Sequence, residues 1–533
     1  MVRQNLLDIV SISSITNTNI EKQAEDWIFN FLSEIPYFKE HTDQRGRFSL
    51  EGDPLGREIV WGLYLSPESK GRTALLINHH DVVSVEEYGK DAEFAFRGEE
   101  LTELLKERDL DSLVQEDLDS GNWLFGRGVA DMKGGLVIQL DVLNAAILRN
   151  LPLNLLYLSV PDEENLSAGM RYSQYLMDTL EKKFDLEYVL GVDGEPYTSN
   201  DNGDVIYYDS SAGKVMLNVY IQGVKSHIGE VLTGFNPLMI LGKLMEQTER
   251  NLDLCDRTEH VVAPPPTWSM ARDFKERYDA SIPLAAGGLF AQVTVSKSAG
   301  EIMEHFHSLC LDLARSEIEA YKKDYLSFYG KERSIAMNVF YYEELLQMAL
   351  EKEEDSWTRH LDSIKKKHEE ELNQGDLSTP EFNFFVIEAL LEFLDYTDPC
   401  IVLAQSPPYY PFAPDILPVS WKEWIEETGE EIYGRKVSNG HYFMGISDLS
   451  YVSTKETLEE SQKVSENIPL WGESYSIPFE LLCKRSIPVV NIGPWGKDIH
   501  KKSERVYLPH IEGEVKAHYL AFFTKIAHSF GGK

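Results

Sequence analysis

Five short apolar runs constrain the fold of this chain more than any other feature. They lie at 73–77, 153–160, 188–193, 400–404 and 487–492. Each run is nearly continuous rather than alternating, which is typical of strands buried on both faces. Helical patterns separate several of them, notably at 134–150 and 167–184. We therefore predict an α/β fold, with a mixed, mostly parallel sheet flanked by helices.

The length of 533 residues predicts at least two domains, because single cores stop growing near about 250–300 residues. The segment 213–325 has a different pattern of apolar and polar residues. It predicts a half-exposed strand at 214–222, another strand at 289–296, and helices between and after them. This pattern predicts a small α+β lid inserted into a larger domain. Residues 1–212 and 326–533 then form the two parts of a catalytic domain, and the second part carries a helical insertion at about 325–440.

The acidic composition excludes some classes of partner. With 88 acidic and 51 basic residues, the chain has a formal charge of -37, which repels phosphate backbones and anionic membrane surfaces. We therefore expect no nucleic acid and no membrane as partners. The four cysteines lie far apart, so neither a disulfide framework nor a thiolate zinc site is indicated. With no signal peptide or membrane span recognised, we expect a cytoplasmic protein.

The first candidate site residues follow the strand at 73–77 and precede the helix at 134–150. His79 and Asp81 come directly after the strand at 73–77. Because alternate residues of a strand share a face, one of them can bind a metal while the other orients the imidazole ring. Asp131 stands among glycines immediately before a helix. Two simpler interpretations stay open at this point, a polar loop for the histidine pair and an N-cap for Asp131.

Further carboxylates and a histidine follow later strands. Glu163 and Glu164 end the strand at 153–160, where Glu164 suits a metal ligand and Glu163 a general base; a solvated acidic turn is the alternative. Either Asp193 or Glu195 supplies a ligand after the next strand, and His500 follows the last one. The carboxyl ends of strands are where open α/β sheets bind ligands. Two histidines and several carboxylates converging there suit a pair of divalent ions such as zinc.

The motifs resemble a known family of enzymes. In chain order they are HHDVV, GRGVADMKGG, PDEE, GEP, GVKSHIGE, GISDLSY and IHKKSE. Their order and spacing are similar to those of the di-zinc metallopeptidases that include aminoacylase, acetylornithine deacetylase and succinyl-diaminopimelate desuccinylase. Two longer segments, 97–121 and about 325–440, together with SPPYYPF, make the chain most similar to the arginine-utilisation (RocB-type) branch.

The resemblance implies a zinc-exopeptidase-like fold with a ferredoxin-like lid and two divalent ions, zinc in the first place, with Co²⁺ or Mn²⁺ as alternatives. The implied metal ligands are His79, Asp131, Glu164, Glu195 and His500, with Asp131 bridging the ions. The implied catalytic residues are Glu163 as the base, Asp81 orienting His79, and His227 of the lid at the oxyanion, in a monomer or a homodimer through the lid. The strand VTVSKS lacks the arginine that many members use against a substrate carboxylate.

The function predicted on this basis is cleavage of an amide bond in a small N-acyl amino acid or peptide, in connection with arginine utilisation. Two alternatives stay open. One is a dipeptidase or exopeptidase on the same scaffold. The other is a metal-binding or regulatory protein that has lost the reaction.

Overall fold

A computed structural model describes residues 2–275, 277–374, 377–472 and 474–530 of the chain. By their internal contacts these residues form two compact units. The first unit contains Met1–Ala212, Ala413–Lys455 and Pro478–Lys533, and the second contains Gly213–Phe412 and Glu456–Ile477. Each unit is described by itself.

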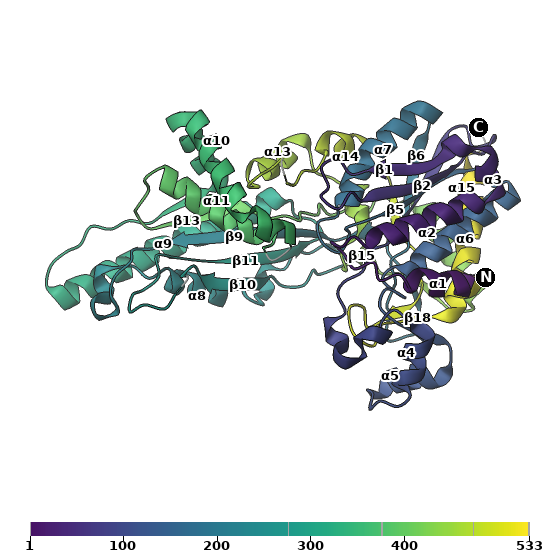
Figure 1. The fold of residues 1–533 in the computed structure, drawn as a ribbon, viewed down its shortest axis with the longest axis horizontal. Coiled ribbons are helices and arrows are strands. Elements are labelled where there is room, and N and C mark those ends of the chain that lie inside the picture. Colours follow the sequence, from purple (N-terminus) through teal and green to yellow (C-terminus); the bar gives the residue numbers. More distant parts are fainter. Residues whose placement is uncertain (1, 276, 375–376, 473, 531–533) are drawn as a thin grey trace. The chain divides into compact units, whose positions relative to one another are not determined.

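The first unit is built on a six-stranded mixed sheet with the order β1-β2-β5-β3-β6-β16. Figure 1 labels β1, β2, β5 and β6 of this sheet. The strands are β1 (Arg45–Ser49), β2 (Glu58–Tyr64), β3 (Arg72–His79), β5 (Asn154–Val160), β6 (Glu187–Asp193) and β16 (Val489–Asn491). The strands β5, β3, β6 and β16 run parallel, whereas β1 and β2 pair antiparallel at one edge. The predicted mixed, mostly parallel sheet is therefore confirmed.

Helices cover both faces of this sheet. One face packs in a large apolar core against α1 (Val2–Val10), α2 (Glu21–Glu34), α6 (Lys133–Arg149), α12 (Val419–Tyr433) and α15 (Val515–Ser529). The strand residues Ala74, Leu76 and Leu155 belong to this core. The next residues along β3 point to the opposite face, where α7 (Ala168–Phe184) packs against β2 and β5 beside α14 (Phe479–Arg485). Burial on both faces explains why the strand sequences are continuously apolar.

The carboxyl ends of the parallel strands lie along one edge of this sheet. There β3 ends at His79, β5 at Val160 and β6 at Asp193. His79 is the last residue of β3, and the segments that follow these strands carry Asp81, Glu163, Glu164 and Glu195.

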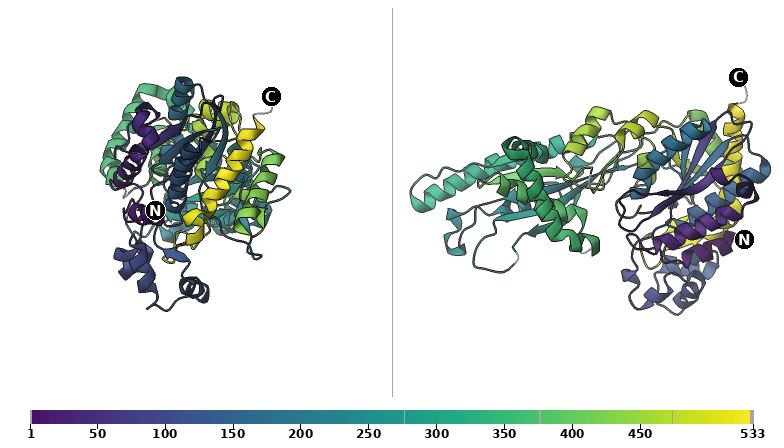
Figure 2. Two further views of the ribbon diagram at one scale, coloured as in Figure 1. Left: turned by 90° about the vertical axis from the view of Figure 1, so that its right-hand side faces the viewer. Right: turned by 45° about the horizontal axis from the view of Figure 1, so that its top comes forward.

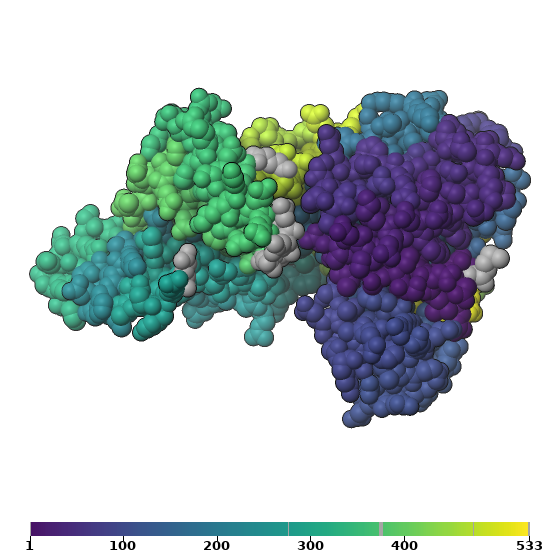
Figure 3. Space-filling model, viewed as in Figure 1, coloured from purple at the N-terminus to yellow at the C-terminus, as the bar shows by residue number. Residues whose placement is uncertain are grey.

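The polar segment between His79 and Asp131 forms a small lobe of the first unit (Figure 3). Its helices α4 (Gly98–Leu105) and α5 (Ser112–Ser120) enclose their own apolar core with Trp123 and Phe125 of β4 (Trp123–Phe125). The strand β4 pairs with β18 (Arg505–Tyr507), which in turn pairs with β17 (Gly496–Lys497). The lobe therefore joins the segment before Asp131 to the segment after His500.

The second unit is a five-stranded sheet with helices on both faces (Figure 2). Its order is β10-β11-β9-β13-β12, formed by β9 (Gly213–Gln222), β10 (Thr267–Asp273), β11 (Ala285–Thr294), β12 (Asn338–Tyr341) and β13 (Cys400–Gln405). The helices α8 (Pro237–Thr248) and α9 (Ala299–Tyr329) pack on one face. On the other face α10 (Tyr342–Gln374) and α11 (Thr379–Phe393) share a core with Tyr220 and Val402. When β12, α10 and α11 are left out, the remaining order β9-α8-β10-β11-α9-β13 is the β-α-β-β-α-β pattern of a ferredoxin-like unit.

The second unit extends beyond the predicted lid, 213–325. The run 400–404, which we expected in the main sheet, forms β13 and pairs antiparallel with β9, with Cys400 opposite Gln222. The helices α10 and α11 of the insertion cover the second face of this same sheet, whereas α12 packs in the core of the first unit. Because β13 pairs with β9, the chain stays in the second unit through β13. It re-enters the first unit at Ala413 rather than at residue 326.

None of the helices among the described residues combines the length and the apolar character that crossing a membrane requires.

Candidate metal centre

The end of β3 presents His79 from a fully buried position. Its Nδ1 lies 3.0 Å from the backbone carbonyl oxygen of Asp81 and 3.4 Å from the Asp81 carboxylate. A proton on Nδ1 satisfies both contacts and leaves the Nε2 lone pair for a metal ion. His80 points the other way, since its Nδ1 lies 3.1 Å from the Ser159 hydroxyl. The three residues are buried, which does not fit the alternative of an exposed polar loop.

Asp131 stands just before α6, but it does not cap this helix. The N-cap is Met132, and it makes no side-chain capping hydrogen bond. The two oxygens of Asp131 face two different histidines instead. Oδ1 lies 3.1 Å from His79 Nε2, and Oδ2 lies 3.1 Å from His500 Nε2. A carboxylate with one oxygen toward each imidazole has the position of a bridging ligand.

The turn after β5 carries the adjacent carboxylates Glu163 and Glu164 in different surroundings. Glu164 Oε2 lies 3.2 Å from His500 Nε2, whereas Glu163 Oε2 lies 3.8 Å from His79 Nε2. Both residues are largely buried. Their backbone N–H groups donate to the two oxygens of the Asp81 carboxylate, at 3.2 and 3.1 Å. Asp81 therefore contacts both His79 and the turn, a second contact that the sequence did not predict.

The structure distinguishes between the two acidic residues at the carboxyl end of β6, Asp193 and Glu195. Glu195 Oε1 lies 3.3 Å from His79 Nε2. Asp193 Oδ1 instead accepts the N–H of Gly194 at 2.8 Å. Of the two, Glu195 therefore belongs to the cluster around His79, as its GEP motif suggested.

The spacing of these groups fits divalent metal ions. One ligand atom each from His79, Asp131 and Glu164 lie within 4.8 Å of one another. Four ligands around a tetrahedral zinc ion lie about 3.3 Å apart when the bonds are about 2.0–2.1 Å long. The nitrogen-to-oxygen separations given above for Asp131, Glu164 and Glu195 are 3.1–3.3 Å. His79 and Glu195 lie on one side of Asp131, and His500 and Glu164 on the other.

The charges of the cluster also favour bound cations. Burial raises the pKa of Glu163, Glu164 and Glu195, and the negative charge of Asp131 raises it further for the last two. Although burial disfavours the protonated imidazole of His79, hydrogen bonds to Asp131, Asp81 and Glu195 raise its pKa well above the usual value. Carboxylates gathered away from water need positive charge to remain ionised. Bound divalent ions would supply it.

Two further residues join the segments of the site and were not predicted to do so. Arg127 Nη1 pairs with Glu504 Oε2 at 2.5 Å, and Arg127 Nη2 donates to the carbonyl oxygen of His500 at 3.2 Å. The other oxygen of Glu504 accepts the N–H groups of Ala130 and Asp131. The buried Arg127–Glu504 pair thus ties the Asp131 loop to the His500 loop. Both residues lie within the quoted motifs GRGVADMKGG and IHKKSE, which was the available signal.

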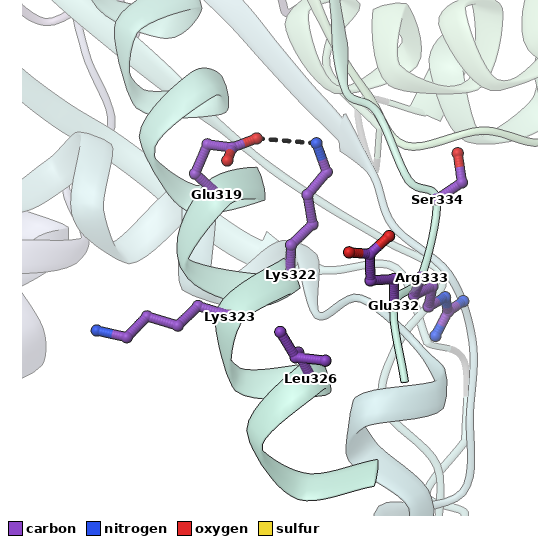
Figure 4. Close-up of a pocket in the computed structure, with 7 residues that line it drawn as sticks. All are labelled: Glu319, Lys322, Lys323, Leu326, Glu332, Arg333 and Ser334. Atoms are coloured by element: carbon purple, nitrogen blue, oxygen red, sulfur yellow. Dashed lines mark hydrogen bonds and ion pairs between the residues drawn. The ribbon is translucent and has the colours of Figure 1, made fainter. Parts of the chain in front are cut away.

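His227 lies in the second unit, where it is exposed and begins a short helical turn. Its Nδ1 accepts the N–H of Gly229 at 3.1 Å. A pocket of the same unit lies at the end of α9 and is shown in Figure 4. Lys322, Lys323 and Arg333 line this pocket, and Lys322 pairs with Glu319 at 2.8 Å. None of the predicted site residues is among the seven that line it.

A family model and two bacterial relatives match most of this chain. The model of peptidase family M20/M25/M40 matches residues 75–522. The Bacillus subtilis protein YqjN is 32% identical over 95% of this chain and 92% of its own length. Protein RocB of the same organism is 28% identical over 94% of this chain and 90% of its own length.

A solved structure has the same fold. The M20 family metallo-carboxypeptidase Sso-CP2 from Sulfolobus solfataricus superimposes with a TM-score of 0.56 at 10% identity, covering 98% of this chain and 99% of its own. The family match indicates a metal-dependent hydrolase of peptide or amide bonds. This chain belongs to peptidase family M20/M25/M40.

Proposed function

We propose that this chain hydrolyses an amide bond in a small N-acyl amino acid or peptide, with two divalent metal ions bound around Asp131. The observation that carries the proposal is the placement of His79 and His500 on the two oxygens of Asp131, at 3.1 Å each, with Glu163 beside them. His79 and Glu195 would hold one ion, and His500 and Glu164 the other.

Each residue then has a separate task. When bound, the ions polarise the scissile carbonyl and lower the pKa of a water molecule. Glu163 accepts the proton of the attacking water and returns it to the leaving amine, because one acid/base group can perform both transfers. Asp81 orients His79 and holds the turn of Glu163. His227 is proposed for the oxyanion on the family resemblance alone.

The proposed substrate class is connected with arginine utilisation. The link to arginine utilisation rests on the RocB-type motifs and on the 28% identity with RocB. The acidic exterior is compatible with a cationic substrate. We further propose a small-molecule substrate with neither nucleic acid nor membrane as a partner, a cytoplasmic location, and a monomer or a homodimer.

The proposal is tested with a panel of N-acyl amino acids and dipeptides that includes arginine-containing members. Wild-type protein would be assayed after chelation and again after reloading with Zn²⁺, Co²⁺ or Mn²⁺, with Glu163→Gln as the matched control. Metal-dependent hydrolysis of N-acyl amino acids supports a deacylase, and hydrolysis of dipeptides alone supports the peptidase alternative. Bound metal without hydrolysis of any member would favour the non-catalytic alternative.

A further inference from the structure

A buried ion cluster lies behind the turn that carries Glu163 and Glu164. At its centre is Arg57, which directly precedes β2 and is 5% exposed. Its Nη1 lies 2.7 Å from Asp162 Oδ1 and 3.2 Å from Glu21 Oε1, and its Nη2 lies 2.8 Å from Asp53 Oδ1. A planar guanidinium with several donors suits such a site, because it can bind several carboxylates in fixed directions.

Asp162 connects this cluster to the site. It has a φ of +69°, in the left-handed region that residues other than glycine adopt uncommonly. Its Oδ2 accepts the N–H of Ala168 at 3.0 Å, and its own N–H donates to Glu21 Oε2 at 3.2 Å. Arg57 thus binds the side chain of Asp162 while Glu21 binds its backbone. These contacts fix the conformation at the first residue of the acidic turn.

The next two residues of the turn are held from the other side. The N–H groups of Glu163 and Glu164 donate to Asp81, as described above. The turn is therefore clamped between Asp81 and the pair of Arg57 with Glu21. Any rotation at Asp162 would move the carboxylates of Glu163 and Glu164, of which the second faces His500 at 3.2 Å.

We propose that Arg57 is a positioning residue for the site, acting through Asp162 on Glu163 and Glu164. Arg57, Glu21 and Asp53 precede residues 75–522, the segment that the family model matches. The clamp therefore adds residues from the N-terminal part of this chain to a site whose other residues lie in the family motifs. Its catalytic consequence rests on the proposed hydrolysis, and its effect on metal binding rests on the proposed pair of ions, which zinc titration of wild type tests without any substrate.

The test compares Arg57→Gln with two milder variants. Arg57→Lys keeps a positive charge but loses the donor fork. Asp162→Asn keeps a side chain that tolerates the left-handed region and can accept the N–H of Ala168, but it removes the charge opposite Arg57. The matched control is Arg47→Gln on β1, since Arg47 pairs at the surface with Asp26 and Glu58 rather than with the turn.

Zinc affinity is measured on monodisperse, folded protein by competition with a chromophoric chelator, and kcat and KM on the substrate that the panel identifies. We expect Arg57→Gln and Asp162→Asn to weaken binding of one of two zinc ions by about 10-fold to 100-fold, the usual effect of losing a partner behind a ligand. We expect kcat to fall with KM unchanged, Arg57→Lys to lie between, and Arg47→Gln to match wild type.

The outcomes separate this inference from the proposed function. If wild type hydrolyses no member of the panel, the proposed function fails, and the zinc affinities alone still decide the role of Arg57. If Arg57→Gln does not fold, Asp162→Asn decides. Wild-type zinc affinity and kcat in folded variants, even with lowered thermal stability, would overturn the inference and leave Arg57 a structural residue.

Discussion

Glu163 and Glu164 are neighbours in the sequence, but their carboxylates face different partners. Glu164 faces His500 at 3.2 Å, the distance of a shared metal ligand, whereas Glu163 stands 3.8 Å from His79. This difference is the physical basis for assigning Glu164 as a ligand and Glu163 as the base.

Glu163→Gln should therefore abolish turnover without releasing metal. The amide keeps the size of the side chain but cannot act as a base. We therefore expect kcat to fall by about 10²-fold to 10⁴-fold or more. Metal content per chain, measured by mass spectrometry of the digested protein, should equal that of wild type. Retained activity would remove Glu163 from its role, and lost metal would make it a ligand.

The buried Glu25 on α2 should make the free energy of unfolding depend on pH. Burial raises its pKa from 4.5 to about 7, so its proton is held more tightly in the folded protein. Its contribution to stability is complete below about pH 4.5 and is lost as the pH rises through about 7. Glu25→Gln should remove this loss and gain about 2–3 kcal/mol at pH 8 relative to pH 5, at about 1.4 kcal/mol per pKa unit.

Urea unfolding of both proteins at pH 5 and pH 8 measures this difference. The control is Glu34→Gln on the same helix, because Glu34 is exposed and its pKa is lowered by Lys39 rather than raised. That variant should keep the wild-type difference between pH 5 and pH 8. An unchanged difference in Glu25→Gln would mean that its carboxyl group titrates normally.

The sequence predicted single residues where position and motif agreed. His79 ends a strand, Asp131 precedes a helix, and Glu164 and His500 follow strands. These four residues do converge. The choice between Asp193 and Glu195 stayed open because residues two apart on an extended chain share a face. Arg57 gave no signal, since its partners Glu21 and Asp162 lie 36 and 105 residues away.

At the scale of elements, α6 and the end of β6 approach each other closely. A Cβ on Gly135, in the first turn of α6, would lie 2.2 Å from the carbonyl oxygen of Gly194. Gly194 directly precedes Glu195. The contact therefore requires glycine and sets the distance between the Asp131 segment and the Glu195 segment.

Gly135→Ala should separate these two elements. We expect a loss of about 1–3 kcal/mol from overpacking, together with weaker zinc binding, both measurable by thermal unfolding and chelator competition. The control is Gly242→Ala in α8, where a Cβ meets no atom within 4 Å. That variant should gain up to about 1 kcal/mol from helix propensity. A Gly135→Ala protein with wild-type stability and zinc affinity would contradict the contact.

Most strands and helices could be predicted from the sequence, but the sheet to which a strand belongs could not always be predicted. The apolar run 400–404 does form a strand, but hydrophobicity records burial and not the identity of the neighbouring strand. The edge strand β10 was missed because its residues are largely exposed and lack the apolar pattern. The ferredoxin-like order depends on both of these strands.

At the scale of the whole molecule, the site residues other than His227 belong to the first unit. Metal binding should therefore stabilise the two units unequally. Zinc at about 1,000 times its dissociation constant adds about 4 kcal/mol to the protein that binds it. Hydrogen exchange of chelated and reloaded protein should show new protection in β3, β5 and β6 and little change in β9 and β11. Equal changes in both units, or none, would contradict this placement.

The proposed function depends on Asp131 bridging two metal ions. Anomalous diffraction at the zinc edge from crystals grown with zinc tests it most directly. We expect two peaks, one between His79, Asp131 and Glu195, and the other between His500, Asp131 and Glu164. A single peak, or peaks bound by other residues, would contradict it.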